Sequence, residues 1–246
     1  MCTVAVSIDP DADFPLILAG VRDEFVDRPW LPPAEHWPGL LGGRDLQAGG
    51  TWLAVDPAAG RAAALLNGHG VLAPADARRS RGELPLLAAA QGRLPDLDPR
   101  RYDPFHLVVA DPAGARLWHW DGVELGREEL PPGTHMIVNS GWEQGEENER
   151  VAFFRPLFAK AARPRSAGGS AAGGGWGEWG EWAFLATGAG LATGDPRAMI
   201  VRHALPDGRV FASLSVTLVA LAPGEVRYDF TAEPRDPASF RRVLPE

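Results

Sequence analysis

The segments CTVAVSI (2–8), DPDAD (9–13) and FPLILAG (14–20) decide the fold of this chain. The first and third segments are apolar and contain β-branched residues, which is typical of strands. The segment between them is rich in Asp and contains Pro, a composition that favours a turn. Together the three segments predict an antiparallel β-hairpin.

This hairpin brings three chemically useful residues together. In an antiparallel pair the numbers of opposite residues have a constant sum, which is about 24 for a hairpin centred near Ala12. Cys2 is then opposite Arg22, with Asp23 next to it, and cross-strand neighbours lie about 5 Å apart. A register shift of one or two residues would exchange Arg22 and Asp23.

Cys2 directly follows Met1, and a small second residue permits removal of the initiator methionine. The mature chain would then begin with a cysteine whose α-amine, with a pKa of about 7.7–8.0, can act as a base toward its own thiol. We expect Arg22 to lower the pKa of that thiol by stabilising the thiolate. Asp23 can accept a hydrogen bond from the amine and orient it.

An amide carbonyl attacked by this thiol needs hydrogen-bond donors for its oxyanion. Asn67 and Asn139 end the apolar segments AAALLN and HMIVN and are candidates, although spacing alone favours a turn residue at Asn67. Other interpretations stay open for the hairpin residues too. Cys2 taken alone fits a small, partly buried terminal residue, and Arg22 with Asp23 fits a structural ion pair.

The composition narrows the class of protein. Among 246 residues, 24 are basic and 32 acidic, a net charge of −8 that argues against nucleic acid and anionic membranes as partners. No apolar run approaches the ~20 residues that span a bilayer, and residues 1–20 lack the basic region of a secretory signal. Cys2 is the only cysteine and the six histidines are scattered, so we expect neither a disulfide nor a metal site. We therefore expect a cytoplasmic protein that needs no cofactor. The expected partner is a small-molecule or acyl substrate, and the oligomeric state stays open.

The rest of the chain predicts more strands than helices. Strands are expected at 49–55, 62–67, 105–110, 115–120, 134–139, 199–203, 209–221 and 225–230. Apolar spacing predicts helices at 146–162, with a kink at Pro156, and in the later part of 74–90. Residues 30–41, rich in Pro and Trp, are expected to be loop. Roughly ten strands with two or three helices predict an α+β fold of antiparallel sheets.

Residues 163–180 are dominated by Gly, Ala and Ser and are expected to be a flexible surface insertion. The repetitive WGEWGEW at 176–182 is expected to be a disordered loop whose rings rest on the surface.

Three longer segments carry a family resemblance: LAGVRDEFVDRP (18–29), GGRDLQAGGTWLAV (42–55) and GRAAALLN (60–67). With the MCTV start, they resemble the NRDE family, also called the transport and Golgi organisation protein 2 family. HMIVNSG (135–141) and, more loosely, RVFASLSVTLVAL (209–221) resemble later segments of that family. The resemblance implies one domain over 1–246, with 163–180 as a local insertion.

The family is similar to the N-terminal nucleophile hydrolases, near choloylglycine hydrolase and penicillin V acylase. That similarity implies a four-layer αββα sandwich of two antiparallel sheets. It also implies Cys2 as nucleophile and base, Arg22 and Asp23 as its partners, and Asn67 and Asn139 as oxyanion or orienting groups.

Two positions depart from the family pattern. Val21 stands where the signature has Asn, and Leu214 aligns with a late Arg that the related acylases place near the nucleophile. If Leu214 occupies that place, one positive group is missing, or a nearby arginine such as Arg202 or Arg209 substitutes.

Three functions follow as hypotheses. The first is an amidohydrolase acting on a carbon–nitrogen bond. The second, implied by the eukaryotic members, is a non-catalytic protein that binds or carries lipid, acyl-CoA or haem, with haem held by Cys2 or His36. Tryptophans would then line an apolar cavity, although a core position is equally compatible with sequence; these are Trp30, Trp37, Trp52, Trp118 and Trp120. The third is an interaction protein that uses the Gly/Trp segment.

Overall fold

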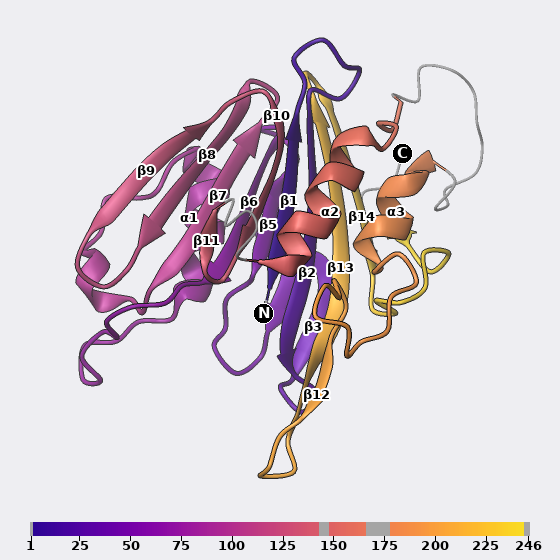
Figure 1. The fold of residues 1–246 in the computed structure, drawn as a ribbon. Helices are drawn as coiled ribbons and strands as arrows, with labels where there is room; N and C mark the ends of the chain where they lie inside the picture. Colours follow the sequence, from indigo (N-terminus) through magenta and orange to yellow (C-terminus); the bar gives the residue numbers. More distant parts are fainter. Residues whose placement is uncertain (1, 143–147, 166–177, 244–246) are drawn as a thin grey trace.

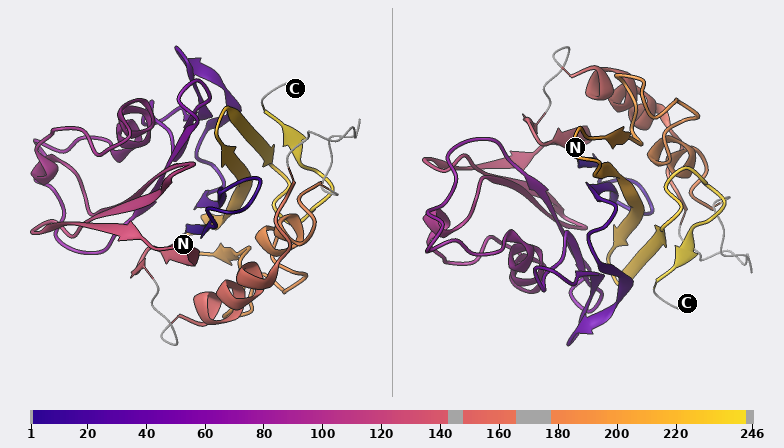
Figure 2. Two further views of the ribbon diagram at one scale, coloured as in Figure 1. Left: turned by 90° about the horizontal axis from the view of Figure 1, so that it is seen from above. Right: turned by 90° about the horizontal axis from the view of Figure 1, so that it is seen from below.

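The computed structural model describes residues 2–142, 148–165 and 178–243. Two antiparallel sheets pack face to face, and helices cover their outer faces (Figure 1). Viewed along the strands, the layers follow one another as helix, sheet, sheet and helix (Figure 2). The predicted fold class, a four-layer αββα sandwich, is confirmed.

The N-terminal hairpin lies at the centre of the first sheet. In spatial order this sheet contains β11 (Gly141–Trp142), β10 (Gly133–Val138), β1 (Thr3–Ile8), β2 (Leu16–Phe25), β13 (Val210–Ala222), β14 (Glu225–Thr231) and β15 (Arg241–Arg242), with β12 (Arg202–Ala204) paired to β13. Thr3 pairs with Val21 and Ile8 with Leu16. The predicted register is therefore confirmed, and its continuation by one residue sets Cys2 opposite Arg22.

The second sheet follows the order of the chain. It contains β3 (Trp30–Trp37), β4 (Leu40–Asp45), β5 (Leu53–Asp56), β6 (Arg61–Asn67), β7 (Phe105–Asp111), β8 (Gly114–Trp120) and β9 (Leu125–Leu130). The expected loop at 30–41 is wrong, because most of it forms β3 and the start of β4. β3 is an edge strand with irregular register, the position in a sheet where prolines are tolerated.

Within the described ranges, three α-helices cover the outer faces. α1 (Leu84–Gln91) packs on β5 and β6, whereas α2 (Glu149–Lys160) packs on β10 and β1, and α3 (Glu181–Ala186) on β2. Short 3₁₀ turns occupy Arg81–Glu83 and Pro99–Arg101. α2 begins at the cap Asn148, whose side chain accepts from the Val151 amide, and continues through Pro156.

Both faces of the hairpin are buried, and residue parity separates them. Even-numbered apolar residues of β1 and β2 pack in the core between the sheets, and odd-numbered ones pack against α2 and α3. This follows from the two-residue period of a strand. At the open end of the hairpin, Cys2 and Arg22 therefore fall on the face between the sheets, and Thr3 and Asp23 fall on the helix side.

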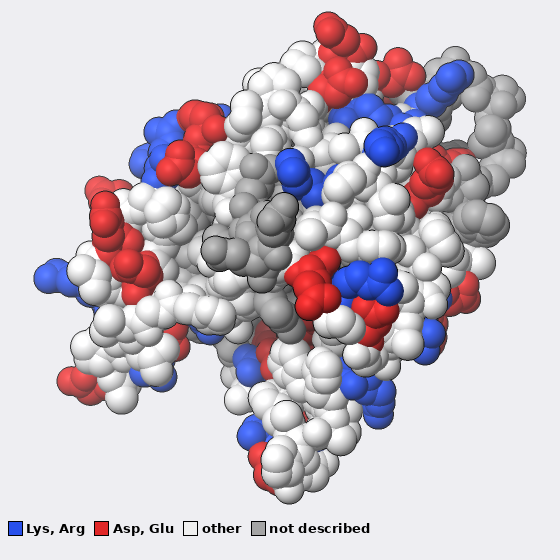
Figure 3. Space-filling model, viewed as in Figure 1, with Lys and Arg blue, Asp and Glu red and all other residues white. Residues whose placement is uncertain are grey.

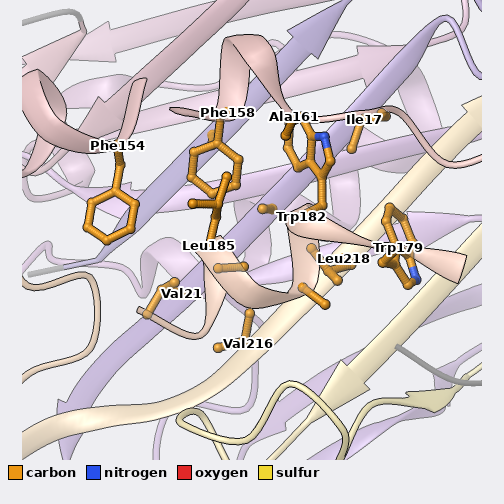
Figure 4. Close-up of a cluster of buried hydrophobic side chains, with 14 of the residues drawn as sticks. Ile17, Val21, Phe154, Phe158, Ala161, Trp179, Trp182, Leu185, Val216 and Leu218 are labelled. Atoms are coloured by element: carbon orange, nitrogen blue, oxygen red, sulfur yellow. The ribbon is translucent and has the colours of Figure 1, made fainter. Parts of the chain in front are cut away.

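The expectation of surface rings at 176–182 is wrong for two of its tryptophans. Trp179 and Trp182 are fully buried in the core under α2 and α3 (Figure 4). Trp182 packs on Phe158 with ring centroids 4.8 Å apart, and the Trp179 indole donates to Asp229. At the other end of the Gly-rich stretch, Arg163 donates to the main-chain oxygen of Phe14. The expected flexibility of 166–177 lies outside the described residues.

Acidic and basic side chains are interspersed on the face shown in Figure 3. None of the helices in the described ranges combines the length and apolar composition needed to cross a membrane.

Candidate active site

An open pocket of about 490 Å³ lies at the end of the two sheets where Cys2 is found. Its walls come from the ends of β2, β4 and β6, from the GGTW turn before β5, and from the loop that precedes α1. The lining residues central to the site are Cys2, Arg22, Asp23, Asp45, Trp52, Asn67 and Arg81. The structure thus brings four of the five predicted site residues to one pocket.

Cys2 is half-buried at the edge of the core between the sheets. Its thiol donates a long hydrogen bond of 3.5 Å to the main-chain oxygen of Asp23. The thiol therefore lies at the mouth of the predicted hairpin, as the register requires.

The expected lowering of the thiol pKa is wrong. Burial, and next the negative charge of Asp23, raise the pKa of the Cys2 thiol above its ordinary value, and the positive charge of Arg22 offsets only part of this effect. Arg22 makes an ion pair with Asp45 and lies over the Trp52 ring.

Arg22 is buried, with one nitrogen, Nη2, 3.5 Å from Asp45 Oδ2. Its guanidinium carbon lies 4.3 Å from the centre of the Trp52 ring and 5.7 Å from that of Trp30. Burial lowers the pKa of this arginine. Its other terminal nitrogen, Nη1, is buried and has no hydrogen-bond partner among the described residues. That nitrogen is an available donor on a residue that lines the pocket with Cys2.

Asp23 is held on the helix side of the sheet by residues from two distant segments. Ser213 Oγ on β13 donates a 2.6 Å hydrogen bond to Asp23 Oδ1. Arg150 Nη1 on α2 lies 3.9 Å from Asp23 Oδ2 and donates to Thr3 Oγ1 at 2.7 Å. Burial lowers the pKa of Arg150. These contacts fix the carboxylate beside the first residues of the chain.

The two predicted asparagines differ in position. Asn67, at the end of β6, is exposed and lines the pocket. Asn139 is buried after β10 and does not line the pocket; its Nδ2 donates a 2.8 Å hydrogen bond to the main-chain oxygen of Asn67. Asn139 Oδ1 is buried and has no hydrogen-bond partner within residues 2–142, 148–165 and 178–243. The pair lies in contact, with Asn139 holding the backbone that carries Asn67.

The sequence profile of the Transport and Golgi organisation 2 family matches residues 1–167. The chain belongs to this family. No curated protein sequence matches it. Among solved structures, penicillin V acylase from Agrobacterium tumefaciens aligns with a TM-score of 0.42 and 15% sequence identity, over 94% of this chain and 83% of that chain.

In this Transport and Golgi organisation 2 family member, the expectation for Leu214, that it stands in place of a late arginine, falls outside the matched residues. Leu214 lies at a bulge in β13, between Ser213 opposite Asp23 and Ser215 opposite Arg22. The expected substitutes are wrong: Arg202 and Arg209 are exposed and line no part of the pocket.

Arg150 supplies a buried guanidinium at this end of the sheet instead. The role of Arg150 is not predictable from the sequence, because a helix position gives no indication of which strand residue it will contact. The sequence contains one indication of this role. Arg150 lies next to Val151 on the apolar side of the predicted helix, where burying a charge is costly unless the charge is paired.

The tryptophans of this family member divide between pocket and core. Trp52 lines the main pocket, and Trp37 lines an adjoining one of about 480 Å³. Trp118 and Trp120 are buried under α1. His36, proposed with Cys2 for haem, bonds to the Pro32 main-chain oxygen and lines neither pocket. Among the described residues, no three His, Cys, Asp or Glu side chains gather in a way that could hold a metal ion.

Proposed function

We propose that this chain is an N-terminal cysteine amidohydrolase that cleaves a carbon–nitrogen amide bond. The observation that carries the proposal is the placement of Cys2 at an open pocket, opposite Arg22 and against Asp23. Removal of Met1 places the base and the nucleophile on the same residue.

Because the pKa of the Cys2 thiol is raised, the α-amine must act as a base that removes the thiol proton. The thiol is protonated at neutral pH, so its proton moves to the neutral α-amine as sulfur attacks the amide carbon. A carbon–sulfur bond forms, and the carbonyl electron pair moves to oxygen. Collapse of this intermediate breaks the carbon–nitrogen bond, and the proton passes from the ammonium to the departing amine.

Water then completes the reaction. The free α-amine takes a proton from a water molecule that attacks the thioester, the carbon–sulfur bond breaks, and the thiol regains its proton. The products are a carboxylic acid and an amine, and the enzyme returns to its starting state.

Two donors of the pocket suit the developing oxyanion. Asn67 is exposed at the pocket wall and is held through its main chain by Asn139. Arg22 Nη1 is buried and has no hydrogen-bond partner in the described part of the chain. Asp23, fixed by Ser213 and Arg150, accepts from the α-amine and orients it.

The test begins with intact mass spectrometry of protein expressed in bacteria, which reports whether Met1 has been removed. A panel of N-acyl 4-nitroanilides is then assayed with wild type, with Cys2→Ala, and with a form extended at the N-terminus so that the Cys2 nitrogen is in a peptide bond. Turnover by the processed wild type alone is expected. Equal turnover by the extended form or by Cys2→Ala would exclude the mechanism.

A second candidate function is ligand binding without turnover, with a lipid, an acyl-CoA or haem as the ligand. The raised thiol pKa favours it, because a protonated thiol is a weak nucleophile. Ligand binding that is unchanged in Cys2→Ala and in the extended form, with no turnover in any form, would support this candidate.

A further inference from the structure

The pocket contains one arginine without an ion pair in the part of the chain that the structure describes. Its lining includes five arginines and four carboxylates. Four of the arginines form ion pairs: Arg22 and Arg28 with Asp45, Arg78 with Asp103, and Arg79 with Glu83. The fifth, Arg81, forms no ion pair with any residue in the described ranges.

Arg81 is held beside Asn67 by a main-chain oxygen. Its Nη1 donates a 2.6 Å hydrogen bond to Pro104 O, which also accepts from the amide of Gly68 at 2.8 Å. Gly68 directly follows Asn67, the predicted oxyanion residue. This one hydrogen bond leaves the other N–H groups of the half-buried guanidinium for a ligand.

The loop that carries Arg81 is fixed before any ligand arrives. The amide of Thr51 donates to Gly82 O at 2.9 Å, and the amide of Arg79 donates to Arg101 O at 2.7 Å. Gly50 and Gly82 touch so closely that a Cβ on Gly50 would lie 2.3 Å from the Gly82 carbonyl carbon. A donor held by a rigid loop binds a ligand without a large ordering cost.

The charge balance of the pocket defines the ligand. When the ion-pair partners outside the lining, Glu83 and Arg150, are counted with it, six arginines stand against five carboxylates. This leaves one positive charge, and the carboxylates of Glu24, Asp45 and Asp103 disfavour a multiply charged anion. A planar guanidinium with free N–H groups matches a carboxylate in both geometry and charge.

We propose that the substrate is an amide that also carries a single carboxylate, and that Arg81 is the specificity residue that binds this carboxylate. This inference rests on the amidohydrolase proposal. The carboxylate then lies near the carbonyl that faces Asn67, which places it close to the scissile bond.

Isothermal titration with N-acetylglycine and with its neutral counterpart, N-acetylglycinamide, tests this, and Cys2→Ala reports binding without turnover. Wild type and Cys2→Ala are both expected to bind the carboxylate about tenfold or more tighter than the amide, since a charge-assisted hydrogen bond is lost with the amide. Arg81→Gln should remove this preference. Arg202→Gln, which removes an equal charge from the exposed strand β12, should retain it.

The outcomes separate the two proposals. Equal affinity for both compounds, binding of neither by wild type, or an unchanged preference in Arg81→Gln would overturn the carboxylate site. A preference that depends on Arg81 in a protein that cleaves no amide would support the site and count against the hydrolase. Circular dichroism of Arg81→Gln establishes that its loss of preference is not a loss of fold.

Discussion

Arg150 on α2 donates a 2.7 Å hydrogen bond to the hydroxyl of Thr3, the residue that follows Cys2. The same nitrogen lies 3.9 Å from the Asp23 carboxylate. One buried side chain therefore joins the helix layer to the start of the chain and to the carboxylate beside the thiol. We regard Arg150 as a positioning residue, because it acts through Thr3 and Asp23.

Replacing this guanidinium should alter the chemistry of Cys2 as well as stability. Arg150→Met leaves the buried Asp23 charge without this cation, so we expect a loss of about 2 kcal/mol in unfolding free energy. It should also raise the pKa of the thiol, seen as a shift of the alkylation pH profile to higher pH. Arg150→Lys, which keeps the charge, should restore most of the profile.

Arg155→Met on the exposed side of α2 is the matched control. A loss of stability in Arg150→Met with an unmoved alkylation profile would show a purely structural role.

The pKa of the Cys2 thiol should respond to its two charged neighbours in opposite directions. In wild type, the rate of alkylation by iodoacetamide should rise with pH around a midpoint above the ordinary value of about 8.5, because burial and Asp23 raise this pKa. Asp23→Asn should lower the midpoint, and Arg22→Met should raise it. A wild-type midpoint at or below that of free cysteine would contradict the structure.

The core under α3 should be sensitive to the tryptophans of the WGEWGEW segment. Trp182→Ala removes a fully buried ring from the contact with Phe158 and should cost about 3–5 kcal/mol in unfolding free energy. Phe184→Ala, on the exposed side of the same helix, should cost at most about 0.5 kcal/mol. Urea denaturation measures both, and similar values for the two variants would place Trp182 outside the core.

Close contact between two glycines should control the loop that carries Arg81. In Gly50→Ala the new methyl group would lie 2.3 Å from the Gly82 backbone, so the loop must move, at a cost of about 1–3 kcal/mol. The preference for N-acetylglycine should weaken at the same time. Gly194→Ala, where no atom lies within 4 Å of the added Cβ, should change neither property. A normal preference in a folded Gly50→Ala protein would show that loop position does not govern binding.

Asp45 should stabilise the protein in a pH-dependent way. Burial alone would raise its pKa, but the Arg28 hydrogen bond, the Ala48 amide and the charges of Arg28 and Arg22 together lower it. The stabilisation is therefore present above the unfolded value of about 3.9 and is lost as pH falls through the lower folded value.

The stability difference between wild type and Asp45→Asn should consequently be largest near neutral pH and shrink below about pH 4. Urea denaturation at a series of pH values measures it. A difference that is independent of pH would show that the charge of Asp45 contributes nothing.

The central hairpin was predictable because its signals are local. A turn of DPDAD between two apolar runs fixes which residues are opposite, and the observed pairing of Thr3 with Val21 follows by counting. The edge strand β3 was not predictable from its prolines, because only its place at the sheet edge makes them acceptable. Likewise, the compositional bias around Trp179 and Trp182 concealed two core residues, since burial there depends on the contact with α2 and β14.

The sequence by itself determined the family, the antiparallel sheets, and the meeting of Cys2 with Arg22 and Asp23, because short motifs and a hairpin register depend on neighbours along the chain. Tertiary contacts were needed to show that Arg150 supports Asp23, that Asn139 lies behind Asn67 rather than in the pocket, and that Arg81 has no ion pair within the described ranges. The tertiary structure also decided the direction of the thiol pKa, which depends first on burial and next on the charge of Asp23. Each of these features joins segments far apart in sequence, so it exists only once the sheets and helices have packed.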